Sequence, residues 1–217
     1  MTQDHIDQAA PTIECFFDCS SPYTYLAFEN LQPLAAEFGA RIVWRPILVG
    51  AIFNAVNPGI EFFKPNGEPR LPQRKIDYAI KDLADRSRAA GITLHFPPRG
   101  HPVNSVGVMR ACIVLEPQGK LIAFARAAFQ AYFGEQRLIS EDAVIAELCQ
   151  AVGVDAAALL ASIAQPQAKA ALRANVDEAI ARGAFGSPTF YLNGSDMYFG
   201  DDRLPLLRLA LERGRLG

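Results

Sequence analysis

The hydrophobic pattern of this chain changes its period twice, and these changes limit the folds that it can adopt. Residues 12–18 form a short apolar run typical of a strand. From residue 22 to a glycine at position 39, apolar side chains recur at steps of three and four, which predicts an amphipathic helix. Residues 41–48 form a second strand-like run. A strand, a helix and a strand at this spacing predict a βαβ unit, with parallel strands and a right-handed crossover.

The middle of the chain has a different pattern. The pattern changes from about residue 50, and prolines and glycines between residues 58 and 72 predict a long irregular connection. Strand-like alternation is nearly absent after it. Helical periodicity instead covers residues 73–90, 104–116, 119–133, 140–152, 155–163 and 166–182.

From residue 183 the strand pattern returns. A glycine-containing turn leads into a strand, Asn193-Gly194 is a typical hairpin turn, and a returning strand precedes a final helix. The order βαβ, helices, ββα is that of an α/β thioredoxin-like fold with an all-helical domain inserted after the second strand. We therefore predict a thioredoxin-like domain made of residues 12–49 and 183–217, and an inserted helical domain over residues 50–182.

Composition excludes several classes of function. The formal net charge of -2 gives no reason to expect nucleic acid or an anionic membrane as a partner. No apolar run approaches the roughly 18 residues of a membrane span, and the first residues lack the features of a secretory signal, so we expect a cytoplasmic protein. The 4 cysteines and 3 histidines show no ligand spacing. We expect buried thiols in a reducing compartment and no metal site.

Polar turns precede both the first and the last helix. Ser20 and Ser21 stand directly before Pro22, and either serine suits the role of helix N-cap. Residues 187–188 read Ser-Pro, for which a trans bond at the start of an edge strand is the ordinary structure. Residues 201–202 are two aspartates, and both also suit an N-cap. The residues alone leave these structural explanations open.

Five motifs carry a resemblance to a known family. They are FFDCSSPYTYLAFENL (16–31), WRPILVGAIFNAVN (44–57), LPQRKIDY (71–78), GAFGSPTFYLNG (183–194) and FGDDRLPLL (199–207). With these motifs in this order, the chain resembles the 2-hydroxychromene-2-carboxylate isomerase family, which is related to kappa-class glutathione transferases and to DsbA-like thiol oxidoreductases. The resemblance implies glutathione as cofactor, a small aromatic substrate and a homodimer.

The resemblance also implies the reactive group. Disulfide-exchange relatives begin this helix with a C-P-x-C motif, and the corresponding residues here are Ser21, Pro22, Tyr23 and Thr24. Serine forms no disulfide, so redox exchange is excluded at this site. A helix N-terminus lowers the pKa of a nearby thiol, and bound glutathione is the thiol that the family supplies. Ser21 is thus expected to be the catalytic residue, with its hydroxyl donating to the glutathione sulfur. Ser20 is expected to be the helix cap or a residue of the backbone turn.

Further contacts with glutathione follow from the same resemblance. Ser187 is expected to bind the cysteinyl backbone, because the bond to Pro188 is cis in thioredoxin-like folds. Asn57 and Lys75 match residues that reach the glycyl end of glutathione. Lys75 lies in a charged stretch, for which a solvated surface is the alternative explanation.

Asp201 and Asp202 match the γ-glutamyl site. The N–H groups at the helix start are expected to bind the ligand α-carboxylate, and Asp202 is expected to pair with its α-ammonium. Similar proteins usually have a serine or another small polar residue in place of Asp201. Its carboxylate would repel the ligand carboxylate unless it turns away, so its contribution to binding is open.

The resemblance implies a glutathione-dependent cis–trans isomerase that acts on 2-hydroxychromene-2-carboxylate or a related aromatic catabolite. The alternatives are a kappa-like glutathione transferase that releases a conjugate, and a non-catalytic glutathione- or thiol-binding module. Clefts between domains commonly hold substrates. The side chains available to line such a cleft, each also explained by core packing, are Phe53, Phe62, Phe63, Tyr78, His95, Phe96 and Asn104.

Overall fold

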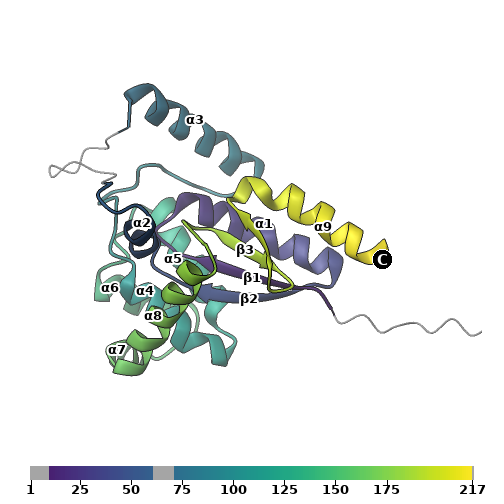
Figure 1. Cartoon of the computed structure of the whole chain (residues 1–217). Coiled ribbons are helices and arrows are strands. Elements are labelled where there is room, and N and C mark those ends of the chain that lie inside the picture. The colour runs from purple at the N-terminus through teal and green to yellow at the C-terminus, as the bar shows by residue number, and fades with distance from the viewer. Residues whose placement is uncertain (1–9, 61–70, 217) are drawn as a thin grey trace, which may run out of the picture.

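The computed structural model describes residues 10–60 and 71–216 around a four-stranded mixed sheet (Figure 1). β1 (Thr12–Phe17) is parallel to β2 (Arg41–Pro46) on one side and antiparallel to β3 (Thr189–Leu192) on the other. β4 (Asp196–Phe199) pairs with β3 and completes the order β2-β1-β3-β4. This topology confirms the predicted thioredoxin-like α/β fold, including its parallel βαβ unit.

Helices account for the regular structure that the described residues form between β2 and β3. α1 (Pro22–Phe38) joins β1 to β2, and α9 (Leu204–Leu216) follows β4 after the short 3-10 helix η3 (Asp201–Arg203). Between β2 and β3 lie α2 (Val49–Val56), α3 (Gln73–Ala89), α4 (Val106–Leu115), η1 (Glu116–Gln118), α5 (Leu121–Phe129), η2 (Gln130–Gly134), α6 (Asp142–Ala151), α7 (Ala156–Ile163) and α8 (Pro166–Ala181). None of the described helices has both the length and the apolar character needed to cross a membrane.

The alternation of side chains along β1 separates two hydrophobic cores. Ile13, Cys15 and Phe17 enter the larger core, which also contains side chains of α1, α9 and the helices α4 to α8. Phe16 points to the opposite face, into a smaller core completed by Ile47, Ile52, Val176, Ala179, Ala184 and Tyr191. Both cores therefore contain side chains of the sheet and of the helical stretch. The division into residues 12–49 with 183–217 and residues 50–182 stays a proposal based on chain order.

Two local predictions had different outcomes. Asn193 and Gly194 have φ angles of 49° and 84°, so the predicted hairpin turn is confirmed. No helix was predicted between the second strand and residue 73, whereas the structure has α2 at Val49–Val56. Ile52 is the one buried side chain of α2. The N-cap residue of the helix, Leu48, makes no side-chain hydrogen bond. The local sequence therefore carries little helical signal.

Candidate active site

Ser21 lies between the end of β1 and the start of α1. Its backbone is extended (φ -101°, ψ 123°) and its Oγ accepts a hydrogen bond from the Thr24 N–H at 3.2 Å, so Ser21 is the N-cap of α1. Pro22 takes the first helical position, where an N–H has no partner within the helix. Of the two roles expected for Ser20, helix cap or turn residue, the structure supports the second. The Ser20 N–H donates to Asp18 Oδ1 at 2.9 Å, in the turn before the cap.

The turn at Ser187 and Pro188 lies directly against this helix start. The Ser187–Pro188 peptide bond is cis, as expected for the fold. The Ser21 hydroxyl donates to the Ser187 carbonyl oxygen at 3.3 Å, and the Thr24 Oγ1 and Ser187 Oγ atoms lie 2.8 Å apart. All three side chains are buried. Both cysteine positions of a C-P-x-C motif thus hold hydroxyl groups that are hydrogen-bonded to the cis-proline turn.

None of the four cysteine thiols of the chain is exposed at this turn. The cysteines are free and buried, and burial raises the pKa of the Cys15 and Cys19 thiols well above their usual values. Cys19 precedes the serine turn, but its side chain belongs to the larger hydrophobic core. A buried, protonated thiol is a poor nucleophile, so a reactive thiolate here has to come from a ligand. Among the described residues, His, Cys, Asp and Glu form no group of three or more able to hold a metal ion.

A buried carboxylate that the sequence reasoning overlooked supports the serine turn. The Asp18 side chain is fully enclosed, and its Oδ2 accepts the N–H of Val49 at 2.8 Å, at the first residue of α2. The hydroxyls of Ser20 and Ser105 also bond to it. Burial raises the pKa of Asp18, while these hydrogen bonds act in the opposite direction. Asp18 thus connects the Ser21 turn, the start of α2 and the segment before α4. Its sequence signal was an acidic residue at the end of an apolar strand.

The start of η3 lies beside the same turn. The N–H of Gly200 donates to the Pro188 carbonyl oxygen at 3.0 Å, which joins the end of β4 to the cis-proline turn. The next residue, Asp201, is buried and its Oδ2 bonds to Nη2 of Arg86, a residue of α3. The carboxylate therefore turns toward a guanidinium group rather than standing alone at the helix start.

Arg86 is shared between two carboxylates. Its Nη1 lies 3.3 Å from Asp82 Oδ2, and its guanidinium carbon lies 5.8 Å from the ring centre of Tyr23, in the first turn of α1. Burial raises the pKa of Asp201 to about 6, because the attraction of Arg86 does not outweigh the loss of water around the carboxylate. Burial likewise raises the pKa of the Tyr23 phenol.

Three other predicted ligand residues bond elsewhere. Asp202 is exposed and pairs with Arg203 at 2.7 Å. Asn57 is the C-cap of α2, and its side-chain amide donates to the carbonyl oxygen of the preceding turn at 3.0 Å. Lys75 is exposed in the first turn of α3. Within residues 10–60 and 71–216, none of these side chains bonds to Ser21 or Ser187, so their assignment to the two ends of glutathione remains a prediction.

The side chains expected to line a substrate cleft are scattered, and Phe62 and Phe63 lie outside the described residues. Phe53 is half-buried and His95 is exposed. Tyr78 is 67% exposed. Asn104 is also exposed and accepts the Val106 N–H at 3.0 Å, at the start of α4. The half-buried Phe96 packs edge-on against His101, with ring centres 5.0 Å apart.

His101 and Tyr132 form a polar pair that the sequence reasoning did not select. His101 Nδ1 lies 3.1 Å from the hydroxyl of Tyr132, which is fully buried. Burial lowers the pKa of His101 and raises that of Tyr132, so both groups favour their neutral forms.

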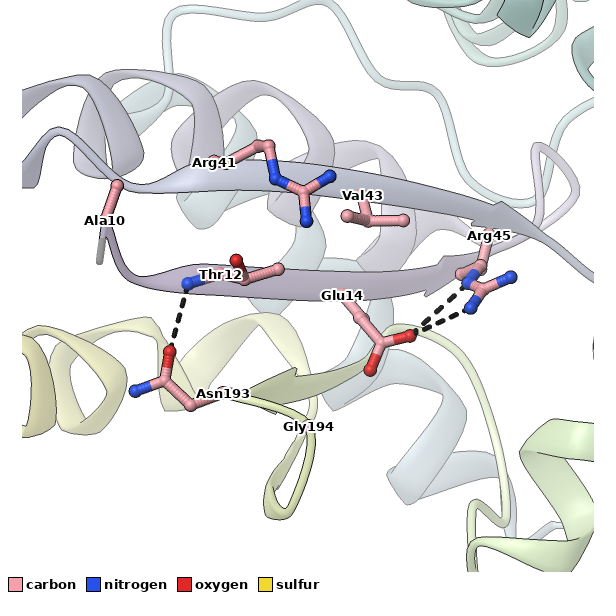
Figure 2. Close-up of a pocket in the computed structure, with 8 residues that line it drawn as sticks. All are labelled: Ala10, Thr12, Glu14, Arg41, Val43, Arg45, Asn193 and Gly194. Atoms are coloured by element: carbon pink, nitrogen blue, oxygen red, sulfur yellow. Dashed lines mark hydrogen bonds and ion pairs between the residues drawn. The ribbon is translucent and has the colours of Figure 1, made fainter.

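A separate pocket of about 630 Å³ opens on the sheet, as Figure 2 shows. Its lining residues are Ala10, Thr12, Glu14, Arg41, Val43, Arg45, Asn193 and Gly194. Glu14 bonds to Arg45 at 3.2 Å and to Arg182 at 2.8 Å, and the hydrogen bond from Arg182 is the main cause of its lowered pKa. The pocket follows one face of β1 and β2 as far as Arg45, and neither Ser21 nor Ser187 is among its lining residues. We therefore assign these paired charges to structure.

Comparison with known proteins agrees with this geometry. The DSBA-like thioredoxin domain matches residues 12–212. The chain is 28% identical to 2-hydroxychromene-2-carboxylate isomerase of Pseudomonas putida (93% of this chain, 94% of that protein) and 30% identical to glutathione S-transferase kappa 1 of Homo sapiens (95% and 93%). A solved structure of 2-hydroxychromene-2-carboxylate isomerase matches with a TM-score of 0.81 at 28% identity, over 93% of this chain and 95% of that chain. The chain belongs to the DSBA-like thioredoxin domain family, in the group that includes 2-hydroxychromene-2-carboxylate isomerases and kappa glutathione transferases.

Proposed function

We propose that this protein is a glutathione-dependent cis–trans isomerase acting on 2-hydroxychromene-2-carboxylate or a related aromatic catabolite. The observation that carries the proposal is the replacement of both motif cysteines by Ser21 and Thr24, at a helix N-terminus that still faces a cis-proline turn. Such a site keeps the positive end of the helix dipole and has no thiol of its own, which suits a thiolate brought by a ligand. Similarity to the isomerase along almost the whole chain supports the choice of reaction.

The hydrogen bonds of Ser21 support a simple exchange on binding. The Ser21 hydroxyl now donates to the Ser187 carbonyl oxygen. When it turns to the glutathione sulfur, it stabilises the thiolate, and the Ser187 carbonyl becomes free to accept the cysteinyl N–H. In the described part of the chain the Ser187 N–H donates to no acceptor, so it is available to the cysteinyl carbonyl. One rotation of the Ser21 hydroxyl thus provides a donor for the ligand sulfur and frees an acceptor for the ligand backbone.

The proposed reaction needs no oxidant or reductant, because the thiolate that adds to the substrate is also the group that leaves. The thiolate adds to the carbon–carbon double bond that is conjugated with the ketone of the ring-opened substrate, and the electron pair moves to the ketone oxygen. Rotation about the resulting single bond follows. The double bond then re-forms and expels the thiolate, so glutathione is regenerated as a cofactor. The protein contributes orientation and stabilisation of the thiolate.

A kappa-like glutathione transferase is the second candidate, because the human kappa enzyme is as similar to this chain as the isomerase is, at 30% against 28% identity. In that reaction the carbon–sulfur bond stays intact and the conjugate leaves. We also propose a homodimer and a cytoplasmic location on the resemblance alone.

The test is the turnover of a chromene carboxylate, followed by ultraviolet absorbance with and without glutathione, while free thiol is measured in parallel. Glutathione-dependent turnover without loss of thiol supports the isomerase, and stoichiometric loss of thiol supports the transferase. Binding without turnover would replace both with a non-catalytic module. Ser21→Ala should lower turnover about 10- to 1000-fold, from the loss of one charge-stabilising hydrogen bond and of alignment. Ser20→Ala is the matched control, and the opposite pattern would identify Ser20 as the catalytic serine.

A further inference from the structure

The surroundings of η3 are unusually acidic for a site that is to bind a carboxylate. Asp82, Asp201 and Asp202 lie on α3 and η3, and the positive groups bonded to them are Arg86 and Arg203. Arg203 pairs with Asp202 on the exposed side. Among the residues that the structure describes, Arg86 is therefore the cation paired with both Asp82 and Asp201.

Arg86 is placed to meet a ligand held by the serine turn. It lies over the ring of Tyr23, two residues beyond Ser21, and it bonds to Asp201, which follows the glycine that is hydrogen-bonded to Pro188. The Arg86 side chain is 26% exposed, whereas that of Asp201 is 7% exposed. The guanidinium is thus open to solvent on one side while it covers the buried carboxylate on the other.

The contacts of Arg86 leave room for one more partner. A guanidinium carries five N–H donors, and two parallel bonds to a carboxylate are its preferred geometry. The bond to Asp82 is long, at 3.3 Å, and Asp82 is itself partly exposed to water. An incoming carboxylate can take the place of Asp82, since that residue then returns to solvent at little cost.

We propose that Arg86 determines how this protein recognises the γ-glutamyl end of glutathione: it keeps Asp201 neutralised and donates to the ligand α-carboxylate in place of Asp82. Asp202 is then left for the ligand α-ammonium. This inference rests on the proposed function, because it requires glutathione in the site. It explains how a γ-glutamyl site tolerates an aspartate at position 201, where similar proteins have a small polar residue.

Calorimetric titration with three thiols tests the inference. The first is glutathione, the second carries a 4-aminobutyryl group in place of γ-glutamyl and lacks the α-carboxylate, and the third carries a glutaryl group and lacks the α-ammonium. Arg86→Leu should weaken binding of glutathione and of the glutaryl thiol about 10- to 100-fold, and binding of the aminobutyryl thiol less than about threefold. Arg88→Leu is the control on the same helix, since Arg88 is 75% exposed and pairs with Asp85. It should leave all three affinities unchanged.

A second variant keeps the test valid if Arg86→Leu folds poorly with an unpaired buried carboxylate. The double variant Arg86→Leu/Asp201→Ser removes both partners, and it should still bind the aminobutyryl thiol like the parent while binding the glutaryl thiol about tenfold more weakly. Equal losses for the aminobutyryl and glutaryl thiols, or no loss for either, would overturn the role of Arg86 while glutathione binding by the parent still stands. A parent protein that binds none of the three thiols would overturn the proposed function itself, and the inference with it.

Discussion

The raised pKa of Asp201 predicts a specific dependence of stability on pH. Its pKa is about 6, against an ordinary value of 3.8, with burial as the largest cause. The folded state therefore holds this proton more tightly than the unfolded state. The contribution of the group to stability is fully present below pH 3.8 and is lost as the pH rises through about 6. A difference of about two pKa units corresponds to a loss of about 3 kcal/mol at neutral pH. This value is a net effect, because the attraction of Arg86 already lowers the pKa.

Asp201→Asn should remove this dependence, since asparagine resembles the protonated carboxyl group in shape. We expect the difference in free energy of unfolding between the variant and the parent to be smallest near pH 4. It should rise in favour of the variant to about 3 kcal/mol by pH 7.5. Urea denaturation at a series of pH values measures this difference. The contributions of the other titrating groups to stability are the same in both proteins and cancel. Asp202→Asn is the control, because Asp202 is exposed. A variant that is less stable than the parent at neutral pH would show that the pair with Arg86 outweighs burial.

Two further predictions concern the carboxylates of Asp18 and Asp202. Asp18→Asn should lower the free energy of unfolding by about 1.5–3 kcal/mol, since the buried N–H of Val49 loses its charged acceptor. Urea denaturation measures this free energy, and unchanged stability would refute the connecting role of Asp18. Asp202→Asn should weaken the binding of glutathione and of the aminobutyryl thiol about tenfold and spare the glutaryl thiol. Calorimetry measures this, and a loss confined to the glutaryl thiol would contradict the assignment of Asp202 to the ammonium.

Most of the fold was predictable because most of its elements have a local cause. The parallel pairing of β1 and β2 follows from a helix of 17 residues between two short strands. The hairpin follows from Asn193-Gly194, which adopts the positive φ angles that such a turn requires. The helix α2 escaped prediction because its first N–H is bonded by Asp18, which is 31 positions away in the sequence. A pattern of neighbouring residues cannot show a cap that another element supplies.

The meeting of the two turns was predictable, whereas the roles assigned to their residues stay predictions. Ser21 and Ser187 stand in recognisable turns, and the fold brings these turns together, although they are 166 positions apart. The bond between Arg86 and Asp201 was not visible, since the helical pattern of α3 indicates only the pair of Asp82 and Arg86 four residues apart. Sequence reasoning found the charge conflict at position 201, and only the bond between Arg86 of α3 and Asp201 of η3 showed how it is compensated.

Ser21 caps α1, and we propose that it also stabilises the ligand thiolate; the two roles can be separated because they use different parts of the hydroxyl. Its oxygen accepts the Thr24 N–H as the helix cap, while its hydrogen is donated to the Ser187 carbonyl and, in the proposed complex, to the ligand sulfur. Alanine at an N-cap costs about 1 kcal/mol relative to serine, but glycine costs only a few tenths. Glycine also tolerates the extended backbone of residue 21.

Ser21→Ala and Ser21→Gly should therefore raise the pKa of bound glutathione thiol equally, although their free energies of unfolding differ. Both variants lose the hydrogen that stabilises the thiolate, and only alanine loses most of the capping free energy. Thiolate absorbance in the far ultraviolet, titrated against pH at saturating glutathione, gives the thiol pKa, and urea denaturation gives the stability. If the thiol pKa follows the loss of stability, so that glycine restores the parent value, the hydroxyl hydrogen has no part in thiolate stabilisation. Ser21 would then act as a helix cap alone.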